Sequence, residues 1–170
     1  MKVNITIPVY NEERVLEQSI TALNNFLTKE FSDFEWEILI ADNASVDNTL
    51  NVAKQLKEKF DKVDYIHLDQ KGRGRALKKA WIASNADIVS YMDVDLSTNL
   101  MHFPEMIRGM IKNGCDLATG SRLMKSSRTK RSFKREFISR TYNLMIKTLF
   151  LTKFSDAQCG FKAVSRKIVD

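Results

Sequence analysis

The sequence predicts an α/β fold, with a mainly parallel β-sheet and helices on both faces. Short apolar runs rich in β-branched residues alternate with segments whose apolar residues recur at helical spacing. This alternation is typical of successive strand–helix–strand units, which build parallel sheets. Polar clusters follow the apolar runs, at the position where open α/β sheets bind ligands. The 170 residues suffice for one domain with its own core.

The expected elements follow one another along the chain. Strands are expected over residues 3–9, 36–41, 63–68, 88–92 and 116–120. Helices are expected where apolar residues share one helical face, and a further helix over residues 76–84. These faces comprise Leu16, Ile20, Leu23 and Leu27, then Val52, Leu56 and Phe60, and finally Phe103, Met106, Ile107, Met110 and Ile111. Asn11 is expected to cap the first helix.

Composition excludes several classes of protein. The two cysteines form neither a disulfide framework nor a zinc-ligand pattern. No apolar run approaches the roughly 20 residues of a membrane-spanning helix. The chain has no GxGxxG fingerprint after its first predicted strand and no GxxxxGK[ST] loop, which disfavours the dinucleotide-binding and P-loop folds. His67 and His102 have no partners at metal-ligand spacing, and we assign them no role.

Two aspartates follow the predicted strand 88–92. Asp93 and Asp95 are separated by one residue, and side chains at positions i and i+2 of an extended strand point to the same side. Two carboxylates on one side suit Mg²⁺ or Mn²⁺, which take water and phosphate oxygens as their other ligands. The alternative is an ordinary polar turn, because aspartate is common in turns.

Three further residues are expected on the same rim of the sheet. Tyr10 and Asp42 follow the first and second predicted strands, and Lys71 follows the third within a basic loop, residues 71–75. This loop can supply fixed positive charge to a phosphorylated ligand beside Asp93. Alternatively, Tyr10 packs at a strand end, Asp42 caps a helix and the basic loop is a solvated turn.

Basic residues gather in the last third of the chain. Residues 121–170 contain 13 Lys and Arg against three Asp and Glu, a net charge of +10. Within the basic segment, defined here as residues 125–150, Ile138, Tyr142, Met145 and Leu149 share one helical face. Such a basic amphipathic helix suits an anionic membrane surface. A core-facing helix with a solvated basic side is the alternative, and a nucleic-acid patch is disfavoured because no nucleic-acid-binding motif accompanies it.

Five motifs occur in the order found in a known family. They are Ile7-Pro8-Val9-Tyr10-Asn11-Glu12, the loop at Asp42, Asp93-Val94-Asp95, Gly120-Ser121-Arg122 and Asp156-Ala157-Gln158-Cys159-Gly160-Phe161-Lys162. Together they resemble the family 2 glycosyltransferases with the GT-A fold, and most of all the polyprenyl-phosphate or dolichyl-phosphate glucosyl- and mannosyltransferases. The resemblance covers nearly the whole chain, and the last motif leans towards the glucosyl members.

The resemblance implies roles for residues on the donor side of the reaction. Pro8, Tyr10 and Glu12 match the motif that holds the nucleoside. Asp42 matches a carboxylate that hydrogen-bonds the base. The Asp93-Val94-Asp95 motif matches the site of the diphosphate and of its cofactor, Mg²⁺ or Mn²⁺.

The resemblance also implies residues at the reaction centre and on the acceptor side. Arg122 matches a basic residue near the phosphates, and Asp156 matches a carboxylate close to the reacting carbon. Ser139 and Arg140 match a pattern associated with the phosphate of the acceptor lipid. Gly160 is expected to permit a backbone turn that brings Asp156 towards the sugar.

We therefore expect a single GT-A-like domain over residues 1–170, truncated at its C-terminus because family domains usually continue. It would be a metal-dependent, inverting transferase that moves glucose or mannose from UDP-glucose or GDP-mannose to a polyprenyl phosphate. It would act peripherally at the cytoplasmic face of a membrane, with no nucleic acid as partner. The alternatives are a family 2 transferase that acts on a polysaccharide or glycan, and a catalytically silent fragment that binds nucleotide or membrane.

Overall fold

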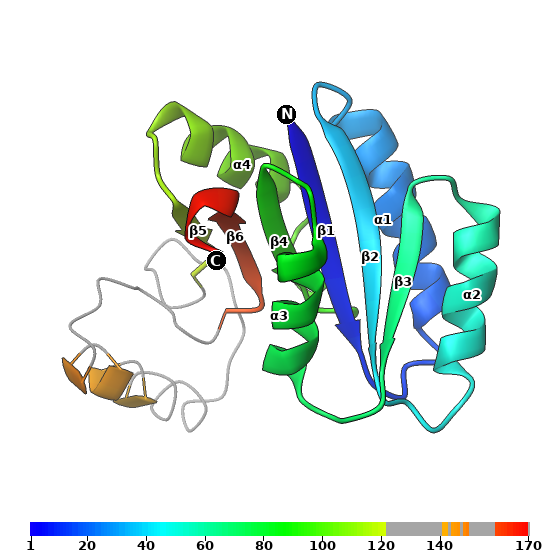
Figure 1. Cartoon of the computed structure of the whole chain (residues 1–170). Helices are drawn as coiled ribbons and strands as arrows, with labels where there is room; N and C mark the ends of the chain where they lie inside the picture. Colours follow the sequence, from blue (N-terminus) through cyan, green and yellow to red (C-terminus); the bar gives the residue numbers. More distant parts are fainter. Residues whose placement is uncertain (122–140, 143, 147, 150–158, 170) are drawn as a thin grey trace.

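The predicted α/β fold is confirmed by a computed structural model, which describes residues 1–121, 141–142, 144–146, 148–149 and 159–169 (Figure 1). Strands and helices alternate from the N-terminus onwards. The strands are β1 (Lys2–Val9), β2 (Glu35–Asn43), β3 (Val63–Leu68), β4 (Ile88–Met92), β5 (Leu117–Thr119) and β6 (Phe161–Ser165). The helices are α1 (Leu16–Glu30), α2 (Thr49–Lys59), α3 (Arg73–Ala83), α4 (His102–Lys112) and the 3₁₀ helix η1 (Arg166–Ile168).

These strands form one six-stranded sheet in the order β3-β2-β1-β4-β6-β5. β1 pairs in parallel with both β2 and β4, and β2 pairs in parallel with β3. The carboxyl ends of β1 to β4 therefore meet at one edge of the sheet, the lower edge in Figure 1. The strand order changes direction between β1 and β4, and a change of this kind marks the usual ligand-binding crevice of an open α/β sheet.

Helices cover both faces of the sheet, which explains why most residues of β1 are buried. Ile5 and Ile7 of β1 are fully buried in the main core together with Leu23 of α1. All four residues of the face predicted for the first helix are buried, as the periodicity indicates. α3 lies on the opposite face, in front of the sheet in Figure 1. It buries only Ala76 and Ala80, small residues that allow the helix to approach the strands closely.

Three phenylalanines join α4 and β6 to the core. The ring of Phe103 in α4 lies 5.2 Å from that of Phe31, which follows α1, and 6.0 Å from that of Phe161 at the start of β6. All three side chains are buried. Aromatic contacts of this kind stabilise a fold beyond the area that they bury, and here they attach a late segment of the chain to the first half.

β6 is absent from the sequence-based prediction and is the main difference in the fold. It runs antiparallel to β4, with Met92 opposite Phe161, and antiparallel to β5, with Ala118 opposite Ala163. Its five residues lack a marked pattern of their own, and such a strand depends on side-chain packing against its neighbours. Because β6 inserts between β4 and β5, residues 159–161 come to lie beside the end of β4.

The starts of two helices also differ from expectation. The predicted cap at Asn11 is wrong, because α1 begins only at Leu16. Asn11 has a φ of 55°, and its Oδ1 accepts a hydrogen bond of 2.9 Å from the backbone N–H of Val46. It therefore joins the loop after β1 to the loop after β2. α3 begins at Arg73, so part of the predicted basic loop forms the first turn of a helix.

Candidate active site

A cavity of about 490 Å³ opens at the carboxyl ends of β1, β2 and β4. Its size lies within the range of small-molecule sites. Five residues predicted for the donor site line it: Pro8, Tyr10, Glu12, Asp93 and Asp95. The remaining lining residues are Val9, Val15, Asn43, Arg73 and Val94. Residues far apart in the sequence are thus brought together because the strands that precede them end at the same edge.

Asp93 and Asp95 line this cavity from a turn rather than from a strand. β4 ends at Met92, and the backbone N–H of Leu96 donates a 3.1 Å hydrogen bond to the carbonyl of Asp93. Oδ1 of Asp95 accepts a 3.0 Å hydrogen bond from the backbone N–H of Ser97. The expected extended geometry is therefore wrong, although the two carboxylates do share one cavity.

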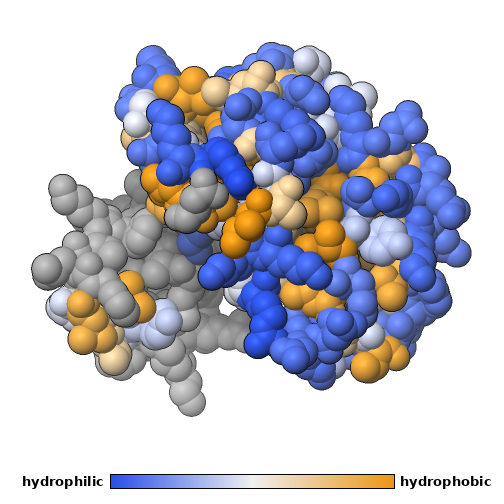
Figure 2. Space-filling view, viewed as in Figure 1, coloured by the Kyte–Doolittle hydropathy of each residue, from blue (hydrophilic) through white to orange (hydrophobic). Residues whose placement is uncertain are grey.

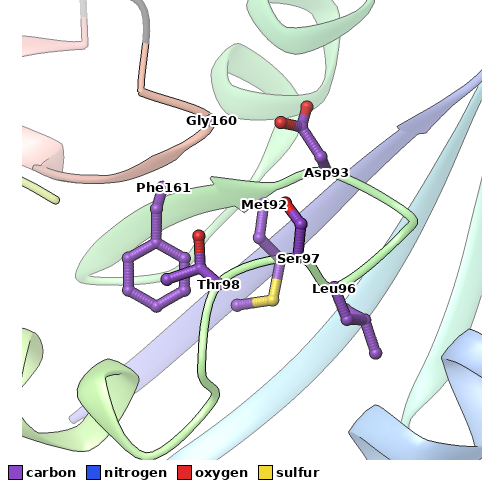
Figure 3. A pocket seen from close by; sticks show the side chains of 7 residues that line it. All are labelled: Met92, Asp93, Leu96, Ser97, Thr98, Gly160 and Phe161. Atoms are coloured by element: carbon purple, nitrogen blue, oxygen red, sulfur yellow. The ribbon is translucent and has the colours of Figure 1, made fainter. Parts of the chain in front are cut away.

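Asp93 is partly buried and faces a cation from α3. Nη2 of Arg73 lies 3.3 Å from Oδ1 of Asp93. This oxygen is shielded from solvent and accepts no hydrogen bond from the described residues. Figure 3 shows a small cavity beside Asp93, bordered by Ser97 and Phe161. With room of about 10 Å³, it can hold one water molecule at most, so the larger cavity is the one that can accept a ligand.

The two aspartates fit a divalent cation that binds together with an anionic ligand. Within the described ranges, no three His, Cys, Asp or Glu side chains gather closely enough to hold an ion by themselves. Mg²⁺ and Mn²⁺ often take only one or two carboxylates and complete their shell with water and phosphate oxygens. Oδ1 of Asp93 accepts no hydrogen bond from the described residues, and this unused capacity to accept is consistent with such a shared site.

Lys71 reaches the cavity only through Tyr10. Its ammonium group contacts the hydroxyl of Tyr10 and lies 4.3 Å from the centre of the ring. The next residue, Gly72, has a φ of 152°, and its backbone N–H donates a 2.7 Å hydrogen bond to Oδ1 of Asn43. These contacts fix the loop before α3 against the ends of β1 and β2, and they hold the aromatic ring at the cavity wall.

Residues at the start of α2 and just before it hold the backbone of Glu12. Oγ1 of Thr49 accepts a 2.8 Å hydrogen bond from the backbone N–H of Glu12 and donates one of 2.6 Å to Asp47. Burial tends to raise the pKa of Asp47, but hydrogen bonds from Thr49 and from the backbone of Glu13 outweigh it and lower that pKa. Asp47 therefore stays charged and keeps this part of the cavity wall ordered.

Asp42 does not line the cavity, and its partner is a residue to which the sequence analysis assigns no role. Its side chain is fully buried, and Oδ2 lies 2.6 Å from Nδ1 of His67. The two residues are directly opposite each other in the β2–β3 pairing. Only the strand register reveals this contact. The base-binding role of Asp42 therefore stays a prediction.

The residues predicted for the reaction centre and for the acceptor side lie outside the described residues. This applies to Arg122, Ser139, Arg140 and Asp156, and to the basic segment except for residues 141–142, 144–146 and 148–149. Those seven residues have helical backbone. In the part of the chain that the structure describes, no helix is both long and apolar enough to cross a membrane.

The sequence matches glycosyl transferase family 2 over residues 4–170. The chain belongs to this family. Family 2 membership confirms the resemblance recognised in the five motifs. It also agrees with the position of the cavity, which is lined by residues of the first and third motifs.

Named relatives within family 2 match nearly all of this chain. Glycosyltransferase AglD of Haloferax volcanii is 33% identical over 168 residues, 98% of this chain and 27% of that protein. The dolichol-phosphate mannosyltransferase of Pyrococcus furiosus is 31% identical, covering 100% of this chain and 48% of that protein. The dolichyl-phosphate beta-glucosyltransferase of Mus musculus is 28% identical, covering 98% and 55%. The chain thus spans about half the length of these relatives, or less.

Solved structures confirm the GT-A fold. Glucosyl-3-phosphoglycerate synthase from Mycobacterium tuberculosis, in complex with Mn²⁺, UDP and phosphoglyceric acid, superimposes with a TM-score of 0.69 at 20% identity. The match covers 98% of this chain and 56% of that one. Mannosyltransferase PcManGT from Pyrobaculum calidifontis, in complex with GDP-Man and Mn²⁺, gives a TM-score of 0.65 at 19% identity, covering 97% and 44%.

Proposed function

We propose that this domain transfers a hexose from a nucleoside-diphosphate sugar to a polyprenyl phosphate. The observation that carries the proposal is the cavity in which Asp93, Asp95 and Arg73 meet the Tyr10 loop. It combines carboxylates for a cation, a guanidinium for phosphate and an aromatic wall for a nucleoside. Family membership supports the class of reaction, and the names of two relatives, a dolichol-phosphate mannosyltransferase and a dolichyl-phosphate beta-glucosyltransferase, support the class of acceptor.

On the donor side, the nucleoside would lie against Pro8, Tyr10 and Glu12, and the diphosphate would lie towards Asp93. The loop that carries Tyr10 and Glu12 is held by hydrogen bonds to the loop before α2 and to Thr49 at the start of α2. Such support reduces the ordering that ligand binding requires. Lys71 would keep Tyr10 in place rather than contact the ligand directly, since the ammonium already faces the ring.

In the reaction, an oxygen of the acceptor phosphate bonds to C1 of the sugar as the bond from C1 to the diphosphate breaks. The nucleoside diphosphate leaves, and the configuration at C1 is inverted. A divalent cation held by Asp93 and Asp95 would neutralise the charge that develops on the leaving group. Arg73 can add two parallel hydrogen bonds to phosphate oxygens. The acceptor is already an anion, so the site needs to position it rather than deprotonate it.

At the reaction centre and on the acceptor side, the proposal depends on the motif resemblance. Asp156 would lie close to C1, Arg122 near the donor phosphates, and Ser139 and Arg140 at the phosphate of the lipid. If Asp156 acts mainly in the transition state, Asp156→Asn should lower kcat and leave the affinity for the donor nearly unchanged. Loss of donor binding instead would assign Asp156 to the nucleotide pocket.

We also propose that the basic segment binds the anionic cytoplasmic face of a membrane and so attaches this domain to it peripherally. Its charge supports this, since each Lys or Arg near such a surface contributes about 1 kcal/mol. Its described part also exposes large apolar side chains, namely Tyr142, Leu144, Met145 and Leu149. Flotation with liposomes should increase with anionic lipid and decrease with salt. Flotation that responds to neither would contradict the membrane proposal.

The main experiment is a transfer assay on the full-length protein. Radiolabelled UDP-glucose and GDP-mannose are offered in turn, with Mn²⁺ and a polyprenyl phosphate, and the label is extracted into organic solvent. We expect one of the donors to label the lipid, and Asp93→Asn to abolish that labelling. Label transferred only to a water-soluble glycan would indicate a different acceptor. Nucleotide binding without any transfer would indicate a catalytically silent fragment.

A further inference from the structure

Gly160 lies against the carboxylate of Asp93, where β6 joins the end of β4 (Figure 3). Met92 and Phe161 are opposite each other in the antiparallel β4–β6 pair. Asp93 follows Met92 and Gly160 precedes Phe161, so the two residues lie just beyond this last pair. A Cβ atom on Gly160 would lie 1.9 Å from Oδ2 of Asp93 and 2.5 Å from its Cγ. Real Cβ atoms do not make contacts this short, so a larger residue at position 160 must displace its neighbour.

The close contact with Asp93, and not the backbone conformation, explains why residue 160 is a glycine. The glycines with positive φ in the described part of the chain are Gly72 and Gly114, so alanine can adopt the backbone of Gly160. The chain does bend at Gly160, but the expectation that this backbone conformation would resist a larger residue is wrong. The residues on either side, Cys159 and Phe161, are each only 2% exposed, and they hold the backbone at this position.

The carboxylate of Asp93 is thus confined on two sides. The backbone of Gly160 borders Oδ2, and the guanidinium of Arg73 lies 3.3 Å from Oδ1. An added methyl group at position 160 meets the far end of a short side chain, which can rotate about its torsions. Rotation of Asp93 requires less free energy than separation of two paired strands. The expected response is therefore a displaced carboxylate in an intact sheet.

We propose that Gly160 is a positioning residue for the metal site: its missing side chain leaves the space in which the carboxylate of Asp93 is held towards the cavity. The inference rests on the proposed function, in which Asp93 binds a divalent cation beside the diphosphate. Gly160 belongs to the same sequence motif as Asp156. The motif whose Asp156 is assigned to the reaction centre therefore also determines the geometry of the metal site.

The test compares the metal-dependent gain in nucleotide affinity among matched variants. Calorimetry measures the binding of UDP and of GDP, each with Mn²⁺ and with EDTA. Residues that hold a metal ligand in place typically change metal affinity by about 10- to 100-fold, so Gly160→Ala should reduce the gain by that factor. In EDTA, the Gly160→Ala variant should bind UDP and GDP with the affinity of the wild type. Gly109→Ala is the control, because a Cβ at Gly109 meets no atom within 4 Å.

A double-mutant cycle identifies the route of the effect. If Gly160→Ala acts only through Asp93, the variant that combines it with Asp93→Asn should lose no more of the gain than Asp93→Asn alone. Additive losses would overturn the inference, as would a Gly160→Ala protein that fails to fold, because the methyl group would then act on the backbone. If Gly160→Ala keeps the metal-dependent gain in nucleotide affinity of the wild type, only the role of Gly160 is overturned. No gain in the wild type would overturn the proposed metal site and this role together.

Discussion

Replacement of Arg73 by glutamine should change the binding of a cation and of a diphosphate in opposite directions. Nη2 of Arg73 lies 3.3 Å from Oδ1 of Asp93, on the wall of the cavity that both residues share with Asp95. A metal ion that binds Asp93 must therefore compete with this guanidinium. Once displaced, the guanidinium remains in the cavity, where it can bind phosphate oxygens.

The magnitude follows from the distance and from the exposure of the two groups. At 3.3 Å, two unit charges attract by about 1 kcal/mol in water and by about 5 kcal/mol at an effective dielectric constant of about 20. The side chains of Arg73 and Asp93 are 62% and 29% exposed, which favours the lower figure. Removal of about 1 kcal/mol of competition should tighten the binding of bare Mn²⁺ by about fivefold. A hydrogen bond to a charged group contributes about 1.5–3 kcal/mol, so the diphosphate should bind about tenfold more weakly or worse.

The assay has two arms and one matched variant. Electron paramagnetic resonance of free Mn²⁺ measures binding of the bare ion, and calorimetry with Mn²⁺ present measures binding of UDP and GDP. Lys78→Gln removes the same charge from the exposed side of α3 and should leave both affinities within about twofold, because exposed charges at a distance are largely screened. Changes of the same sign in both arms for Arg73→Gln would refute the competition between Arg73 and the cation.

Three further predictions concern other residues. Asp95→Asn should weaken Mn²⁺-dependent binding of UDP or GDP far more than binding of the bare nucleoside, and equal losses would contradict a metal ligand. His67→Ala should lower the free energy of unfolding in urea by about 1–3 kcal/mol, because it leaves Oδ2 of the buried Asp42 carboxylate without its hydrogen-bond partner. The hydrogen bonds of Arg108 hold the pKa of Asp33 below its usual value. Their pair therefore adds stability above the usual pKa of aspartate and loses it as the pH falls through the lowered pKa. Arg108→Gln should be slightly less stable than the wild type at neutral pH, and the two unfolding curves should converge in acid.

Most of the fold could be predicted because its signals are local. The face formed by Leu16, Ile20, Leu23 and Leu27 appears in the sequence as a helical period, and all four residues are buried as predicted. Helix starts were harder to locate, since Asn11 has the chemistry of a cap but serves as a bridge to Val46. Local propensity cannot distinguish these two uses of the same amide side chain.

The candidate site was likewise predictable in part, because some of its residues carry a signal in the sequence and others do not. Asp93 and Asp95 were identifiable from residue type and spacing, although they lie on a turn. Arg73 appeared only as one member of a basic loop, and nothing in the sequence indicates that it faces Asp93. His67 carried no recognisable signal, because its partner is a neighbour in the sheet rather than in the chain.

The sequence alone determined the class of the fold, the family and the edge of the sheet at which the candidate site lies, because periodicity and short motifs encode each of these locally. Only the tertiary structure decided which side chains meet there. The insertion of β6 between β4 and β5 brings Gly160 against Asp93, although the two residues are far apart in the chain. Such contacts depend on strand order and register, which arise from the packing of the whole core and leave no pattern in any single stretch of sequence.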